Sequence, residues 1–302
     1  MPIPYRLNPI GKNEKKYFEL IVKPGILAST MTYGVFSAFN DGGYCKVDWG
    51  DGNKDEAVST NITISHTYTV AGTYKVKIQA NCSRINLGAV GRPIVYDCSD
   101  DFSCLIGLTS GNYMFSECSN AVLSLTRLPE QITGGLEMFS GCTNAQLPLT
   151  SLPEGLTNGQ SMFNSCSNAT LPLTSLPDGL TNCASMFRGC SKAQLSLTYL
   201  PEGLTNGASM FVGCTKSKFA FTKLPDGITS ACLMFYGAGS GVEINLDTLV
   251  ANAPADGWVD LTNISEMFYT CPNVTGSRSA FLAKCPNVTN ITDAFRGTNT
   301  TE

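Results

Sequence analysis

The sequence has 302 residues, of which 15% are charged, and its formal net charge is −4. A chain of this length allows two domains of ordinary size. The lack of a basic stripe argues against nucleic-acid binding, and no run of 18 apolar residues is present that would span a membrane.

Residues 1–16 are expected to be an extended arm, because Pro2, Pro4 and Pro9 favour extended backbone. The arm is either a disordered terminus or a strap that docks onto a larger assembly such as a virion. It lacks the apolar core of a signal peptide. We therefore expect either that an export signal has been removed or that the protein leaves the cell by another route.

Residues 17–97 are expected to form a small β-sandwich, since short alternating segments are separated by turn signals. Three runs occur in order, namely Trp-Gly-Asp-Gly at 49–52, His-Thr-Tyr at 66–68 and Gly-Thr-Tyr-Lys-Val at 72–76. This set resembles the PKD domain, an Ig-like sandwich. The resemblance implies that Trp49 is a core anchor.

His66 is the only histidine of the chain. A lone histidine serves either as a catalytic base or as a structural residue that bonds the Asp-Gly turn at 51–52, and the structural role is preferred. Asp48, Asp51 and Asp55 are either turn caps, the preferred interpretation, or calcium ligands through their carboxylate oxygens. Calcium near Asp48 and Asp51 is the only cofactor that the sequence suggests.

Residues 98–113 join the sandwich to the following repeats. Cys98 and Cys104 lie in this segment, and a disulfide between them is left open. Because no Gly/Ser-rich or Pro-rich linker is present, we expect the sandwich to stack directly on the first repeat and to cover its apolar end.

A Met-Phe pair recurs every 24 residues, six times without insertion, from 114–115 to 234–235. Such a period predicts a solenoid, in which each repeat packs only against its neighbours and like positions form rows. Three leucine rows, beginning at Leu123, Leu125 and Leu128, are expected in the core. A further core row holds the phenylalanines Phe115, Phe139, Phe163, Phe187, Phe211 and Phe235.

Within each repeat, the Leu-x-Leu-Thr segment has the alternation of a short strand, and stacked strands would give a parallel sheet. Pro148 and Pro172 occupy the x position, so the strands must be short or irregular there. The Ser-Met-Phe-x-Gly-Cys segment is expected to form a single helical turn that glycine ends.

Cysteines also form a row, which includes Cys142, Cys166 and Cys190. They are either metal or redox groups or small buried side chains at a tight corner, and the second interpretation is preferred because paired Cys-x2-Cys spacings are lacking. No metal site is predicted. The total of thirteen cysteines is odd, and a row of free thiols suits synthesis in a reducing compartment.

The repeat resembles the BspA-like leucine-rich repeats of bacterial surface proteins. The resemblance rests on the Leu-Thr-Asn run at 156–158, the Met-Phe pair at 162–163 and Cys166, and it returns at 263–271. It covers residues 98–302 and implies a recognition or adhesion module that is not catalytic. The expected fold is therefore mainly β: an N-terminal Ig/PKD-like sandwich, then a leucine-rich-repeat β-solenoid with short helical turns.

After Tyr236 the period breaks, since the next Met-Phe pair lies 33 residues on and an Ala-Phe pair follows after 27. Insertions at 247–253 and 277–284 have room for real helical turns. Irregular terminal repeats of this kind are expected to cap the stack.

Rows of varied chemistry are expected to face solvent and to carry any binding surface. Unconstrained surface is the alternative for these rows. Glu130, Glu154, Asp178, Glu202 and Asp226 form an acidic row, which turn chemistry alone explains or which collects cations or a basic partner. The candidate binding residues are Arg127, Tyr199 and Lys223 in one row and Asn164, Arg188 and Tyr236 in another.

No catalytic residue is predicted, because the sequence has no P-loop, no Gly-x-Ser-x-Gly and only one histidine. We expect a binding or display protein of a bacteriophage particle that recognises a protein or glycan surface. A bacterial adhesin with its export signal trimmed is the alternative. A carbohydrate-active enzyme that uses carboxylates such as Glu154 and Glu202 is a remote third hypothesis.

Overall fold

The computed structural model describes residues 17–24, 29–37, 44–58, 61–87 and 95–302. These residues form a mainly β structure with antiparallel sheets at the N-terminal end and no closed barrel. The predicted arm at 1–16 lies outside the described residues. In the described part of the chain, no helix is long and apolar enough to cross a membrane.

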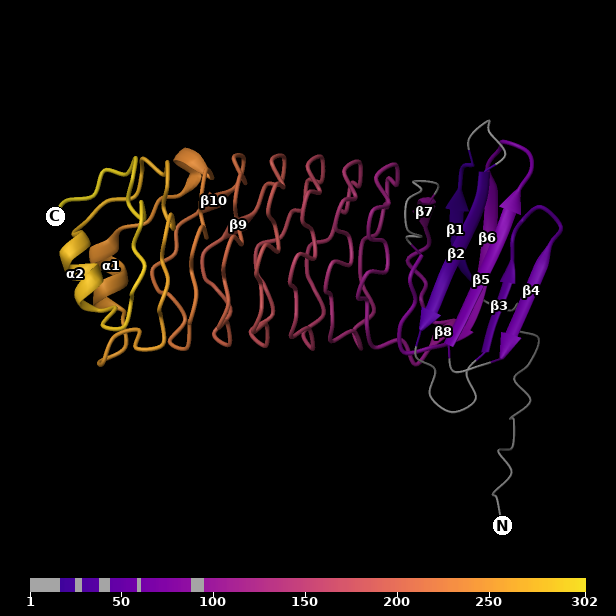
Figure 1. The fold of residues 1–302 in the computed structure, drawn as a ribbon, viewed down its shortest axis with the longest axis horizontal. Helices are drawn as coiled ribbons and strands as arrows, with labels where there is room; N and C mark the ends of the chain where they lie inside the picture. Colours follow the sequence, from indigo (N-terminus) through magenta and orange to yellow (C-terminus); the bar gives the residue numbers. More distant parts are fainter. Residues whose placement is uncertain (1–16, 25–28, 38–43, 59–60, 88–94) are drawn as a thin grey trace, which may run out of the picture.

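Two antiparallel sheets make up the N-terminal part (Figure 1, indigo to purple). The larger has the strand order β4-β3-β6-β1-β7, and β2 pairs with β5 in the smaller. Inward side chains of β1 and β6 are buried at alternate positions, as a sheet with one covered face requires. The strands are β1 (Phe18–Val22), β2 (Ser29–Ser37), β3 (Tyr44–Asp48), β4 (Lys54–Val58), β5 (Asn61–Tyr68), β6 (Tyr74–Asn81) and β7 (Val95–Cys98).

The larger sheet continues directly into the C-terminal part without a linker. The short strand β8 (Leu105–Ile106) adds to β6 in parallel, so the sheet extends past residue 97. The N–H of Leu87 donates to the carbonyl of Met114 at 2.7 Å, and the N–H of Val122 donates to that of Tyr96 at 2.6 Å. The sheet edge therefore supplies hydrogen-bond partners to the first repeat.

The repeats form a stack of coils, one coil per repeat (Figure 1, magenta to yellow). One backbone position bridges in parallel to its equivalent in the next coil through the whole stack. Successive partners are 24 residues apart while the period holds, and the later, longer spacings follow the insertions. The bridged residues are Arg84, Ser110, Gly134, Asn158, Asn182, Asn206, Ser230, Asn263 and Asn290.

Phenylalanine rings stack along the middle of the coils. Phe139, Phe163 and Phe187 lie one above the next, with centroids 5.5 Å apart and planes within 6° of parallel. The row continues to Phe268, 5.6 Å from Phe235. All of these rings are fully buried. Each ring therefore contacts the ring of both neighbouring coils, and the spacing of the coils fixes the row.

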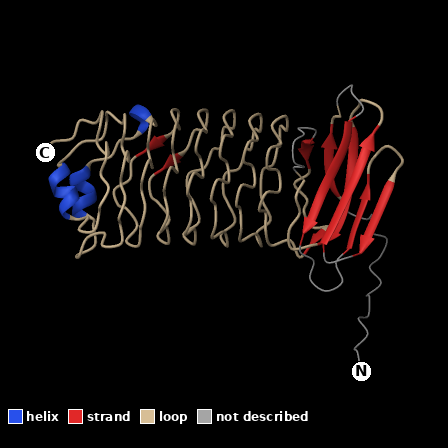
Figure 2. Ribbon diagram, viewed as in Figure 1, coloured by secondary structure: helices blue, strands red, loops and turns tan. Residues whose placement is uncertain are grey.

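The prediction of a parallel sheet at the Leu-x-Leu-Thr segments is wrong for most coils. Only β9 (Ser196–Leu197) and β10 (Lys218–Phe219) pair there (Figure 2), with partners 22 residues apart. In the coils that carry Pro148 and Pro172, the preceding Leu147 and Leu171 have positive φ angles of 44° and 39°. A left-handed leucine together with a proline that lacks an N–H cannot extend a ladder.

The main ladder between coils runs instead through the Met-Phe segment. Alternate N–H groups cross to the next coil: Ser161 donates to Ala184, Phe163 to Met186 and Ser165 to Arg188, at 2.7–2.9 Å. The N–H groups between them bond within their own coil, three residues back.

The expected single helical turn at this segment is therefore wrong. Ser161 and Ser165 have positive φ angles of 52° and 61°, which a right-handed helix excludes. Successive tight turns replace the helix, and equivalent residues of most other coils share the left-handed backbone.

The insertions of the last coils do form short helices. Helix α1 (Leu246–Ala251) begins where Asn245 Oδ1 accepts the N–H of Thr248, and α2 (Arg278–Ala283) begins where Ser277 Oγ accepts that of Ala280. The two helices contact each other at the C-terminal end (Figure 2, blue). A short 3-10 turn, η1 (Gly239–Gly241), precedes them.

The phenylalanine row gives a direct stability test. We expect Phe163→Ala to lower the free energy of unfolding by about 3–5 kcal/mol, because it leaves a cavity between two stacked rings. Phe163→Leu, which keeps most of the volume, should cost clearly less. Urea titration followed by far-ultraviolet circular dichroism measures both. An alanine variant as stable as the parent would contradict this role for the row.

Candidate binding surface

The residue that follows each Phe forms one row along the stack. Its carbonyls accept the crossing N–H groups, for example Arg188 O from Ser165 at 2.7 Å and Tyr236 O from Gly213 at 2.9 Å. The backbone under this row is therefore held at every coil. We call it the Phe+1 row, and its members are Ser116, Ser140, Asn164, Arg188, Val212, Tyr236, Tyr269 and Arg296.

The C-terminal end of the Phe+1 row is aromatic and cationic. The rings of Tyr236 and Tyr269 stack with centroids 4.8 Å apart and planes within 13°. The Arg296 guanidinium lies 5.4 Å from the centroid of Tyr269, within the range of a cation–π contact. Arg296 also forms an ion pair with Asp293 at 3.5 Å. Both tyrosines are half-buried and Arg296 is exposed. We call these three residues the Tyr-Tyr-Arg strip.

Of the candidates in this row, only Tyr236 lies in the strip. Arg188 is exposed, and Asn164 is half-buried with its side-chain oxygen accepting from Ser165 Oγ at 3.1 Å. Sequence reasoning missed Tyr269 and Arg296 because insertions shift them off the 24-residue count. Counting one residue on from Phe268 and Phe295 would have found both.

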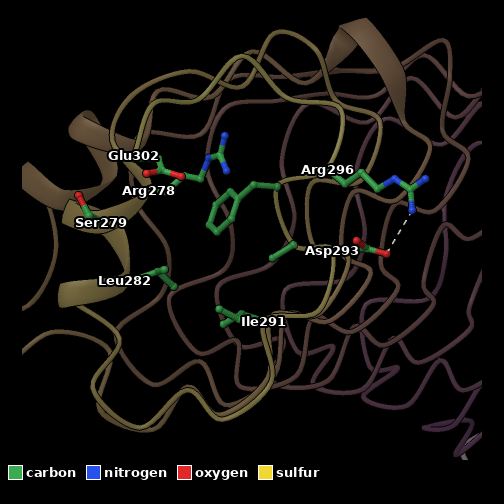
Figure 3. A pocket seen from close by; sticks show the side chains of 9 residues that line it. Arg278, Ser279, Leu282, Ile291, Asp293, Arg296 and Glu302 are labelled. Carbon is green, nitrogen blue, oxygen red and sulfur yellow. Dashed lines mark hydrogen bonds and ion pairs between the residues drawn. The ribbon is translucent and has the colours of Figure 1, made fainter.

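A pocket of about 530 Å³ adjoins the strip at the C-terminal end of the stack (Figure 3). Arg296 and Asp293 lie on one side, Arg278 and Glu302 on another, and Leu282 and Ile291 give it an apolar wall. Arg278 is held in place because its Nε donates to Thr300 Oγ1 at 2.6 Å. The pocket thus combines apolar surface with charges of both signs.

The second predicted row is not brought together into one site. Arg127 and Tyr199 are exposed, and Tyr199 lies three coils beyond Arg127. Lys223 is half-buried and reaches Asp226 at 3.1 Å and Glu202 at 3.7 Å in the acidic row. The remaining acidic side chains, Glu130, Glu154 and Asp178, are exposed.

His66 lies in a structural network rather than in a cleft. Its Nε2 is 2.7 Å from Oδ2 of Asp51 in the Asp-Gly turn, and its ring stacks on Trp49 at 4.8 Å. Trp49 is 2% exposed, and its indole N–H donates to Asp55 at 2.6 Å. The ring of Tyr68 closes the other edge of His66.

The carboxylates suggested for calcium have other partners. Asp48 accepts the N–H of Gly50 and pairs with Lys54 at 2.8 Å, and these bonds hold the pKa of its carboxyl below the usual value. Asp51 accepts the N–H of Asn53 at 3.0 Å in addition to its contact with His66. Across the described residues, no group of three or more His, Cys, Asp or Glu side chains is placed to hold a metal ion.

The cysteine row links neighbouring coils through its thiols. Cys166 Sγ donates to the carbonyl of Phe139 at 3.0 Å, and Cys190 Sγ donates to that of Phe163 at 2.9 Å. Cys142, Cys214 and Cys271 make the equivalent bond. All thirteen cysteines are free, Cys98 and Cys104 included. These bonds need the reduced thiol, because only S–H can donate.

No family model matches this chain, and no curated protein or solved structure is significantly similar to it.

Buried thiols predict a loss of stability at alkaline pH. Burial raises the pKa of Cys118, Cys183 and Cys190 from 9.0 to about 12. Above pH 9 the unfolded chain releases these protons while the folded chain keeps them, so the free energy of unfolding must fall as pH rises. Each thiol contributes up to roughly 1 kcal/mol per pH unit.

Urea titrations at pH 8, 9 and 10 measure this slope. In a Cys190→Ala variant the slope should be shallower by the share of one thiol. A free energy of unfolding that does not change between pH 8 and pH 10 would contradict the burial of the row.

Proposed function

We propose that this protein is a non-catalytic binding protein that displays the Tyr-Tyr-Arg strip to a protein or glycan surface. The stacking of Tyr236 on Tyr269 beneath Arg296 carries the proposal. Tyrosine and arginine are enriched at recognition surfaces because they offer large contact area together with polar ends. Their backbone is fixed by bonds between coils, so little conformational entropy is lost on binding.

We further propose that the protein is part of a bacteriophage particle. The thiol bonds to the phenylalanine carbonyls support folding in a reducing compartment, where phage particles assemble. The two N-terminal sheets are in keeping with a PKD-like sandwich, and the stacked coils with BspA-like leucine-rich repeats. The resemblance to BspA-like repeats also favours an alternative, a bacterial adhesin, and an export signal encoded upstream of Met1 would support it.

The strip is tested by exchanging its tyrosines for the serine that Ser116 and Ser140 place at the same position of other coils. We expect Tyr236→Ser and Tyr269→Ser to weaken binding to the best ligand on an array of bacterial surface polysaccharides and proteins by about tenfold or more. Tyr113→Ser is the matched control, since Ser161 and Ser185 occupy its position elsewhere. Equal losses in all three variants, or no loss in the first two, would refute the strip.

The particle is tested by mass spectrometry and electron microscopy of purified virions from the native source. We expect the protein in a fixed ratio to the other virion proteins. Its recovery only as free monomer in the lysate would overturn this part of the proposal.

A further inference from the structure

A second candidate site lies on the side of the stack where β9 and β10 pair (Figure 1). Here the surface is hollowed over a volume of about 590 Å³, within the range of small-ligand sites. Lys192, Lys216 and Lys218 line the hollow together with Thr170, Gln194 and Ser196. It shares no lining residue with the pocket beside the Tyr-Tyr-Arg strip.

The hollow is positively charged in a protein whose net charge is −4. No carboxylate lines it, and none of its lysines has an ion-pair partner within the part of the chain that the structure describes. Three ammonium groups around one hollow repel one another. An anion held between them would remove that repulsion.

The lysines replace residues that other coils use to bond their neighbours. Asn144 donates to the carbonyl of Ser119 and Asn168 donates to Asn144, and Lys192 and Lys216 continue this position in the next two coils. A lysine side chain cannot accept a hydrogen bond, so the amide contacts along this row end at the hollow.

The backbone beneath the lysines is tied across the two coils. Ser217 is 2% exposed and stands where Ala193 stands one coil earlier. Its hydroxyl donates to the carbonyl of Ala193 at 2.9 Å and accepts the N–H of Leu195 at 3.3 Å. The N–H of Lys218 donates to the carbonyl of Leu195 at 2.9 Å. Lys216 and Lys218 therefore flank a fixed point.

We infer that this hollow, which we call the lysine hollow, binds an acidic glycan through its sulfate, phosphate or carboxylate groups. Lysines supply point charges that accept any of these anions. The amide of Gln194 and the hydroxyls of Thr170 and Ser196 can exchange hydrogen bonds with sugar hydroxyls. No aromatic side chain lines the hollow on which a base would stack, so single-stranded nucleic acid fits less well.

The test measures binding of dextran sulfate, a polyuronate, neutral dextran and poly-glutamate to the full chain by biolayer interferometry at low and high salt. A triple variant, Lys192→Asn, Lys216→Asn and Lys218→Gln, takes its residues from neighbouring coils, so it should fold. We expect it to bind the acidic polysaccharides at least tenfold more weakly than the parent, and the salt dependence to flatten.

The control variant, Lys46→Gln, Lys54→Gln and Lys75→Gln, also removes three positive charges, but from the N-terminal sheet, and should bind within twofold of the parent. Equal losses in both triple variants would overturn the lysine hollow as the site. So would failure of the parent to bind either acidic polysaccharide, or equal binding of neutral dextran. Poly-glutamate bound as tightly as both polysaccharides would overturn the assignment to a glycan.

Tyr269→Ser should leave binding of dextran sulfate unchanged, which separates the lysine hollow from the Tyr-Tyr-Arg strip. A loss of dextran sulfate binding in this variant would overturn the inference that the hollow acts as an independent site.

Discussion

The structure depends on one backbone arrangement: alternate N–H groups of the Met-Phe segment cross from each coil to the next. The arrangement requires residues such as Ser161 and Ser165 to adopt a left-handed backbone, which costs free energy for any residue other than glycine. The cost recurs in nearly every coil, and the crossing bonds at 2.7–2.9 Å offset it. In return, every carbonyl of the Phe+1 row has a donor, and the coils cannot slide past one another.

The crossing bonds also explain why phenylalanine and cysteine recur together. They set the separation at which Phe139 and Phe163 meet face to face at 5.5 Å. At the same separation, the thiol of Cys166 reaches the carbonyl of Phe139. That carbonyl already accepts the N–H of Cys142, so the thiol uses its second lone pair. Serine would place a stronger but shorter donor there, whereas the longer C–S bond spans the gap and remains compatible with an apolar core.

The row structure could be predicted from the sequence because a period without insertions fixes which side chains share a row. The stacking of the phenylalanines and the freely paired thiols follow from that period alone. The position of the main ladder could not be predicted, because serine and leucine give no sign of a positive φ angle. Pro148 and Pro172 showed where the ladder fails but not where it runs. The strip was half predicted: Tyr236 is in register, while Tyr269 and Arg296 follow insertions. The lysine hollow was not predicted, because residues 22 apart pair there and a strict count of 24 does not bring its side chains together.

The departures from the repeat at β9 and β10 show how core and surface are coupled in such a stack. Phe219 and Phe221 stand in rows that are leucine in earlier coils, and their rings lie 4.3–6.1 Å from Phe211. In the same two coils Ser196 and Ala220 replace proline, so N–H groups are available and a short parallel pair forms. A bulkier core thus coincides with a changed pairing register and with the exposed lysines. Because each coil contacts only its neighbours, these changes remain local, and the phenylalanine row passes through them with ring spacings of 5.8 and 5.5 Å. A stack of this kind can therefore vary one surface coil by coil while the interactions that hold it together stay the same.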